Sequence, residues 1–179
     1  MLIKKITKTL FILFVISSLL LTSCGEELEY ELVDVDHEGL VCAVPGHFVA
    51  YAHDEADGYY ASLNASYTVY AMTHSEVGEK FITYVGDYTA KSFSDYLVQL
   101  HSYNAQVNAN EDGSRAFFTY LMTSTEDSTT YYNSNTVIST DDMIYVVVLT
   151  CMADKLDYYA DMFIDCTEKI RFKSDTVAK

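Results

Sequence analysis

Acidic side chains near the start of the chain have the types and spacing that bind cations. Asp34, Asp36 and Glu38 supply oxygens at the first, third and fifth positions of an EF-hand calcium loop, and Gly39 supplies the glycine of the sixth. The twelfth position requires a bidentate glutamate but is Pro45. The sequence therefore excludes an EF-hand. We expect these acids to be solvated, with a looser cation site as the alternative.

Two further clusters combine histidine with acids. The run His53–Asp57 crowds donors together but has the composition of a loop. His74 and Glu76 are spaced to share one face of a strand, yet two ligands do not make a metal site. The sequence therefore predicts no metal site.

Nucleophilic and phosphate chemistry also lack their usual motifs. There is no Gly-x-Ser-x-Gly and no phosphate-binding glycine loop in a chain with 7 glycines. Cys42 and His47 are near neighbours, but the Pro45-Gly46 turn separates them. We therefore expect no catalytic residues, no cofactor and no enzymatic activity. An unrecognised hydrolase remains the alternative, because catalytic residues need not form a sequence motif.

Three cysteines follow Cys24, an odd number that cannot all pair among themselves. Cys151 ends a predicted strand and Cys166 lies three turns into the next predicted helix. At the helical rise this places them roughly 18 Å apart, too far for a disulfide. Cys42 could pair with Cys166, but three buried thiols are the stronger expectation. None of the spacings is that of a structural zinc site.

The first residues have the organisation of an export signal. Lys4, Lys5 and Lys8 precede any acid, and an apolar run from Leu10 to Leu21 follows. A basic head, an apolar middle and a small-residue end are typical of a secretory signal peptide. A membrane-spanning helix needs roughly 20 apolar residues, more than this run contains.

The residues that end this signal, Leu21-Thr22-Ser23-Cys24, resemble the lipobox of bacterial lipoproteins. The resemblance implies cleavage before Cys24 and a diacylglyceryl thioether on its sulfur, with palmitate as the expected acyl group. Two acyl chains hold a soluble domain on a membrane far better than one chain does. We expect a protein anchored by lipid to the extracytoplasmic face of a cell membrane, with inner and outer membrane both left open.

The charge balance excludes one class of partner. The chain carries 11 Lys and Arg against 26 Asp and Glu, a net charge of −15. Residues 1–23 include three of the lysines and no acids, so the mature chain has a net charge of about −18. DNA and RNA are therefore not expected partners. Anionic lipid would repel such a chain, which leaves membrane attachment to the lipid on Cys24.

Hydrophobic periodicity predicts an α+β fold, with helices packed on an antiparallel sheet. Ser92 and Asp95 have the form of a capping box that starts a helix. Met143–Leu149 is apolar on both faces, which indicates a central strand. Short connections favour antiparallel pairing. The main predicted elements are strands at 39–44, 114–123, 129–140 and 143–149, a polar turn at 75–78, and helices at 93–103 and 154–172.

Residues 92–172 resemble the PsbP-like fold, which also includes a Ran-binding nuclear protein and DcrB-like lipoproteins. The features that carry the resemblance are the capped helix, the three-strand meander, and the terminal helix directly after the apolar strand. The resemblance implies an α/β/α sandwich and an assembly or interaction role, and no functional residue transfers. The predicted boundaries are a signal peptide at 1–23, a flexible acidic tether at 24–38, a single domain at 39–173 and a tail at 174–179.

These observations favour a non-enzymatic interaction or assembly module at the cell envelope, with another envelope protein as a partner. A small-ligand or cation-binding lipoprotein is the alternative, because the 16 tyrosines could line a groove as well as pack a sheet.

Overall fold

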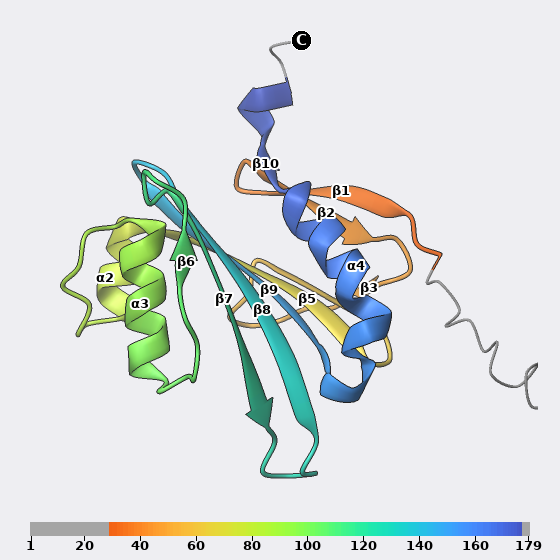
Figure 1. The fold of residues 1–179 in the computed structure, drawn as a ribbon. Helices are drawn as coiled ribbons and strands as arrows, with labels where there is room; N and C mark the ends of the chain where they lie inside the picture. The colour runs from red at the N-terminus through yellow and green to blue at the C-terminus, as the bar shows by residue number, and fades with distance from the viewer. Residues whose placement is uncertain (1–28, 177–179) are drawn as a thin grey trace, which may run out of the picture.

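Residues 29–176 of the computed structural model form two antiparallel sheets and three α-helices, drawn in Figure 1. The larger sheet has the strand order β3-β4-β5-β9-β8-β7-β6, and the smaller has the order β1-β2-β10. The helices are α2 (His74–Lys80), α3 (Ala90–Leu100) and α4 (Leu156–Glu168). The strands are β1 (Leu32–His37), β2 (Leu40–Pro45), β3 (Val49–Ala50), β4 (Gly58–Ala61), β5 (Ala65–Thr73), β6 (Asn108–Ala109), β7 (Arg115–Thr123), β8 (Thr130–Ser139), β9 (Met143–Met152) and β10 (Arg171–Phe172).

Strand β9 lies at the centre of the larger sheet, as its apolar composition predicts. It pairs with β5 on one side and with β8 on the other, both antiparallel. Because successive side chains point to opposite faces, Val147 and Leu149 join one buried cluster and Ile144 and Val146 join another. We call the two sides of this sheet the α4 face and the α3 face, after the helices that cover them (Figure 1).

The α4 face is covered by α4 together with the smaller sheet. Every residue of β2 is buried. Leu40 and Cys42 of β2 pack in the same cluster as Phe163 of α4 and Tyr67 of β5. This arrangement gives the sheet a second layer made of a helix and a sheet side by side.

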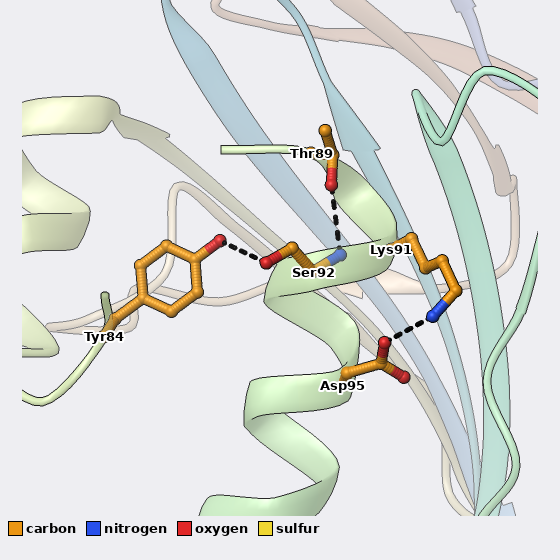
Figure 2. A network of polar contacts seen from close by, with 5 residues as sticks. All are labelled: Tyr84, Thr89, Lys91, Ser92 and Asp95. Carbon is orange, nitrogen blue, oxygen red and sulfur yellow. Dashed lines mark hydrogen bonds and ion pairs between the residues drawn. The ribbon is translucent and has the colours of Figure 1, made fainter. Parts of the chain in front are cut away.

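Helix α3 begins three residues before the start that the sequence predicts, and Figure 2 shows why. The Thr89 hydroxyl accepts a hydrogen bond from the Ser92 backbone N–H at 3.1 Å and so caps the helix. Ser92 lies inside the first turn and accepts a hydrogen bond from the Tyr84 hydroxyl at 3.2 Å. Asp95 pairs with Lys91 at 2.6 Å. The predicted Ser92–Asp95 capping box is therefore wrong.

The predicted tether is also wrong for part of its length. Residues 32–37 form β1, which pairs with β2 along its whole length. Asp34 and Asp36 bind Arg171 and Lys173 of the C-terminal segment, the second pair at 2.7 Å. These acids are thus held on a sheet and face cations from the other end of the chain. The sequence places those cations 137 positions away, so no local pattern could have shown the strand's partner.

A short helix replaces the predicted turn and the strand that would have held His74 and Glu76. Thr73 and Glu76 form a capping box: the Thr73 hydroxyl accepts from the Glu76 N–H at 3.2 Å, and the Glu76 carboxylate accepts from the Thr73 N–H at 2.8 Å. Val77 anchors this helix in the core with no exposed surface. The Thr-x-x-Glu signal was present in the sequence.

The last helix is shorter than its periodicity predicts. It ends at Glu168, and Arg171 and Phe172 form β10, paired with Val41 and Leu40 of β2. Residues 173–176 follow as a 3₁₀ turn. The apolar spacing continues past Glu168 because Ile170 remains buried, but the backbone leaves the helix to bond with the smaller sheet.

All three cysteines of the described domain are free and buried, which confirms the expectation of buried thiols. Burial raises the pKa of Cys42 and of Cys151 to about 11 and that of Cys166 to about 12. Cys42 faces the core, whereas His47 is exposed and packs against Phe48. The two are therefore not a nucleophile and its base.

Candidate binding surfaces

The sequence-predicted site residue, Cys24, lies outside the described residues. The acidic clusters that could have bound a cation are used in other ways. Asp57 accepts a hydrogen bond from the Ala71 N–H at 2.6 Å, and His74 stacks on Tyr88 with ring centroids 4.3 Å apart. Between residues 29 and 174, no three His, Cys, Asp or Glu side chains gather in a group that could hold a metal ion.

A cleft of about 650 Å³ lies between the α3 face of the larger sheet and the two helices that cover it. We call it the α3 cleft. Four strands supply its floor, and α2, α3 and the residue Tyr103 supply its walls. Its lining side chains are Glu55, Thr68, Tyr70, Met72, Lys80, Phe81, Phe93, Leu97, His101, Tyr103, Phe118, Tyr120, Asn135, Val146, Val148 and Thr150.

The floor of the α3 cleft follows from strand register. Thr68 of β5 stands opposite Val148 of β9, which stands opposite Asn135 of β8, which stands opposite Phe118 of β7. These residues form one row across four strands, and directly opposed side chains lie on the same face. The next row contains Thr150 of β9. The two rows bring hydroxyl and amide groups together on a face that is otherwise apolar.

Two asparagines of β8 carry unpaired donors on the α3 face of the sheet, and Asn135 lines the cleft. Asn133 and Asn135 are only 4% and 5% exposed, and the amide nitrogen of each has no hydrogen-bond partner. The Asn133 side-chain oxygen accepts from the Thr150 hydroxyl at 2.9 Å, so that residue is satisfied in part. A buried polar group without a partner costs about 1–3 kcal/mol. A group that carries this cost at the floor of a cleft does not stabilise the fold, which indicates a role in binding.

Aromatic rings form the wall above this floor. Tyr103 lies parallel to Tyr120, with centroids 3.7 Å apart, and His101 stacks on Tyr103 at 5.1 Å. Burial raises the pKa of Tyr120, and hydrogen bonding to the Tyr103 hydroxyl raises it further. The Asn135 amide lowers the pKa of Tyr120, which places this amide near the Tyr120 hydroxyl. No acceptor, however, lies in hydrogen-bonding geometry with the Asn135 amide nitrogen. Tyr120 is therefore a neutral phenol at physiological pH.

Two charged side chains and a histidine lie at the mouth of the α3 cleft. Glu55, Lys80 and His101 line it and are exposed to solvent. The floor row of Thr68, Val148, Asn135 and Phe118 carries no charge. The cleft is thus apolar and aromatic inside, with a few polar groups, and ionic only at its entrance.

A second surface lies on the α4 face, where α4 meets β7 and β8. Phe117, Leu121 and Ile164 are 37%, 65% and 54% exposed. Phe117 and Ile164 line a groove of about 430 Å³ together with Tyr132, and Leu121 stands opposite Tyr132 in the sheet. We call these four side chains the β7–α4 strip. It is an apolar surface beside a strand edge.

That edge is open for most of its length. β6 pairs with β7 only at Ala116 and Phe117, and β6 is the last strand of the sheet on that side. Within the part of the chain that the structure describes, residues 118–123 therefore have no strand on their outer side. Unpaired backbone groups at an edge are a template for another strand. Asp157 and Glu168 of α4 border the groove and make its rim acidic.

Sequence reasoning did not find either surface. The signal for the α3 cleft was the Asn133-Ser134-Asn135 run, which puts amides at alternate positions of a strand, between Tyr131 and Val137 on the same face. The signal for the strip was weaker, because an exposed leucine cannot be told from a buried one until the neighbouring strand is known.

Comparison with known proteins identifies the fold. No protein-family model matches the chain, and no curated protein matches its sequence. The Ran-binding protein Mog1p of Saccharomyces cerevisiae superposes with a TM-score of 0.50 at 12% identity, covering 75% of this chain and 83% of that one. The PsbP protein CyanoP of Synechocystis gives 0.48 at 12% identity, covering 85% and 98%. The predicted α+β fold class is confirmed, and the likeness to Mog1p supports it at the level of fold alone.

Proposed function

We propose that this chain is a non-enzymatic interaction module, anchored by lipid on Cys24 to the extracytoplasmic face of a cell membrane. The observation that carries the interaction role is the β7–α4 strip. Soluble proteins rarely leave a contiguous apolar surface exposed unless it meets a partner. The chain has 26 acidic residues with which to cover its surface. A shortage of polar residues therefore does not explain why Leu121 and Ile164 are exposed.

The β7–α4 strip and the strand edge beside it favour an extended peptide segment as the partner. The free backbone of residues 118–123 would pair with an added strand, and apolar side chains at alternate positions of that strand would reach Phe117 and Leu121. Basic residues on the segment would meet Asp157 and Glu168 at the rim. The proposed partner is therefore an envelope protein with an exposed, basic and amphipathic strand.

Lipid on Cys24 would keep this surface close to the membrane. The domain is fixed from Tyr30 onward, because the Tyr30 hydroxyl donates to Asp165 at 2.8 Å and the Glu31 carbonyl accepts from the Gly46 N–H at 2.7 Å. Tyr30 lies six positions after Cys24, a distance that an extended chain spans with at most about 21 Å. We propose a signal peptide at 1–23, followed by a tether that runs only from Cys24 to β1. This tether is shorter than the one at 24–38 that the sequence predicts. No helix in residues 29–176 is long and apolar enough to cross a membrane.

The anchor is tested by Cys24→Ala in the full chain. We expect the protein to move from the membrane fraction to the soluble fraction and to lose the mass of the diacylglyceryl group. Leu63→Ala, a substitution at an exposed turn, serves as the control and should leave the protein on the membrane. An unchanged membrane pool for Cys24→Ala would remove the lipid anchor from the proposal.

The strip is tested by a photo-crosslinking residue placed at position 121 in cells. We expect a discrete crosslinked product that disappears when Ile164→Asp is added, because a charge in the groove opposes apolar contact. Position 63 is the matched control, since Leu63 is also an exposed leucine but lies in the turn between β4 and β5. Equal products from the two positions, or a product insensitive to Ile164→Asp, would overturn the proposed interface.

A further inference from the structure

The α3 cleft has the dimensions and lining of a small-molecule site. Its volume of about 650 Å³ falls in the middle of the range for ligand pockets, which are mainly apolar with a few placed polar groups. It lies on the opposite sheet face from the β7–α4 strip, so an occupant would not compete with a docked strand. This inference is therefore independent of the proposed interface.

The unpaired Asn135 amide specifies one feature of the occupant. Asn135 is 5% exposed, lines the cleft, and has an amide nitrogen without an acceptor. It stands between Val148 and Phe118 in its row, where an apolar side chain would complete the packing. A ligand with an oxygen acceptor would satisfy this donor and recover the free energy that its burial costs.

The walls specify the shape. Tyr103 and Tyr120 already stack face to face, and Phe118 lies 6.2 Å from Tyr120 with the rings 18° from parallel. Aromatic faces in such an array favour a flat ring in offset contact with them. Rings of this kind lose little conformational freedom on binding, so the surface suits a rigid ligand more than a flexible chain.

The charge distribution specifies a neutral ligand. The floor contains amide and hydroxyl groups, and the raised pKa of Tyr120 keeps that phenol uncharged. An ionised ligand buried on this floor would have no counter-ion, because Glu55 and Lys80 lie at the mouth. We propose that the α3 cleft binds a neutral, flat ring compound that presents a carbonyl oxygen to the Asn135 amide.

Two bicyclic probes of nearly equal size test the proposal in the mature domain. Coumarin has a carbonyl oxygen and naphthalene has none, so the ratio of their affinities reports the hydrogen bond while ring burial cancels. We expect both to shift the amide NMR resonances of β8 and β9 in the wild type. Asn135→Leu should reduce the preference for coumarin over naphthalene about fivefold, the effect of one neutral hydrogen bond, and leave naphthalene affinity equal or higher.

Three controls make each outcome informative. The thermal midpoint of Asn135→Leu should not fall, since leucine replaces a donor that has no partner. Val148→Phe fills the floor and should abolish binding of both probes. Leu121→Asp, on the other face, should leave both affinities unchanged although it would disrupt the proposed interface.

Four results would overturn the inference. The wild type could fail to bind either probe, or the affinity ratio could be the same in wild type and Asn135→Leu. Resonance shifts confined to residues outside the α3 cleft would equally contradict it. An ordered water on Asn135 that persists in the presence of coumarin would show that solvent, and not a ligand carbonyl, satisfies the amide.

Discussion

The two faces of the larger sheet are built from the same strands but are covered differently. On the α4 face, a helix and a three-stranded sheet lie side by side, and Tyr67, Val147 and Leu149 have no exposed surface. On the α3 face, the cover consists of α2 and α3, and the α3 cleft lies between these helices and the sheet with Asn135 in its floor. Around β5 and β9 the α4 face is therefore a completed core, whereas the α3 face is a core left open.

Residues next to each other on β9 show what makes the difference. Val147 and Leu149 point into the completed core, whereas Val148 and Thr150 point into the α3 cleft. The sheet itself is therefore not what leaves the cleft open. The opening arises because α3 spans 11 residues and polar side chains occupy positions where a sealed core would take apolar ones.

The largest expected effect separates these two faces directly. Leu149→Ala should destabilise the domain by about 3 kcal/mol, because it removes a fully buried side chain and leaves a cavity. Val148→Ala, one residue away, should cost less than about 1 kcal/mol, since its methyl groups already face open space. Urea unfolding followed by circular dichroism measures both. Equal losses would show that the α3 face is as tightly packed as the α4 face.

A pH series tests the burial of His37 at the edge of the completed core. Burial lowers the pKa of His37 below its usual 6.5, outweighing the nearby Asp57 and Asp36 carboxylates. The unfolded chain then binds a proton that the folded chain does not, so the free energy of unfolding should fall as pH drops below 6.5. One proton limits the slope to about 1.4 kcal/mol per pH unit.

The matched variant for this series is His37→Gln. It should flatten the dependence in the range just below pH 6.5, and acid-dependent loss at lower pH should remain because carboxylates titrate there. A slope that persists unchanged in His37→Gln would assign the titration to another group. Gly58 must stay a glycine in this experiment, because a Cβ there would clash with the His37 ring.

The smallest expected effect concerns the aromatic wall of the α3 cleft. A double-mutant cycle of Tyr103→Leu and Tyr120→Leu should give a coupling free energy of about 1 kcal/mol, as for other stacked aromatic pairs. Thermal unfolding of the four proteins provides it. A coupling near zero would mean that Tyr103 does not hold the wall in place in solution. The α3 face would then be packed even less tightly relative to the α4 face.

Local patterns predicted much of the fold. The apolar run at 143–149 correctly indicated a central strand, and three successive strand segments correctly indicated a meander. Errors arose where a distant segment decides the conformation. Residues 33–36 alternate valine and aspartate, the period of a strand. Their acidity suggested a tether, because the sequence does not show that Arg171 lies beside Asp34. The last helix ends early for the same reason, since β2 is the partner of Arg171 and Phe172.

The binding surfaces were less predictable than the fold. Asn135 becomes notable only when register places it beside Val148 and Phe118, and register is a property of three strands together. The edge beside Leu121 is open because β6 pairs with β7 only at Ala116 and Phe117. Both features depend on what is missing from a neighbouring position, which no single segment encodes.

The smaller sheet, in which β2 pairs with both β1 and β10, has a consequence for the order in which the chain folds. Asp34 and Asp36 receive their cations from residues 137 positions later, and β2 gains its second neighbour only from Arg171 and Phe172. A chain in which Arg171 and Phe172 have not yet been made lacks the third strand of this sheet, and contacts so far apart in sequence form slowly. The β1–β2 hairpin can therefore form first from neighbouring residues, whereas the third strand and both cations reach it only after Arg171 to Lys173 have been made.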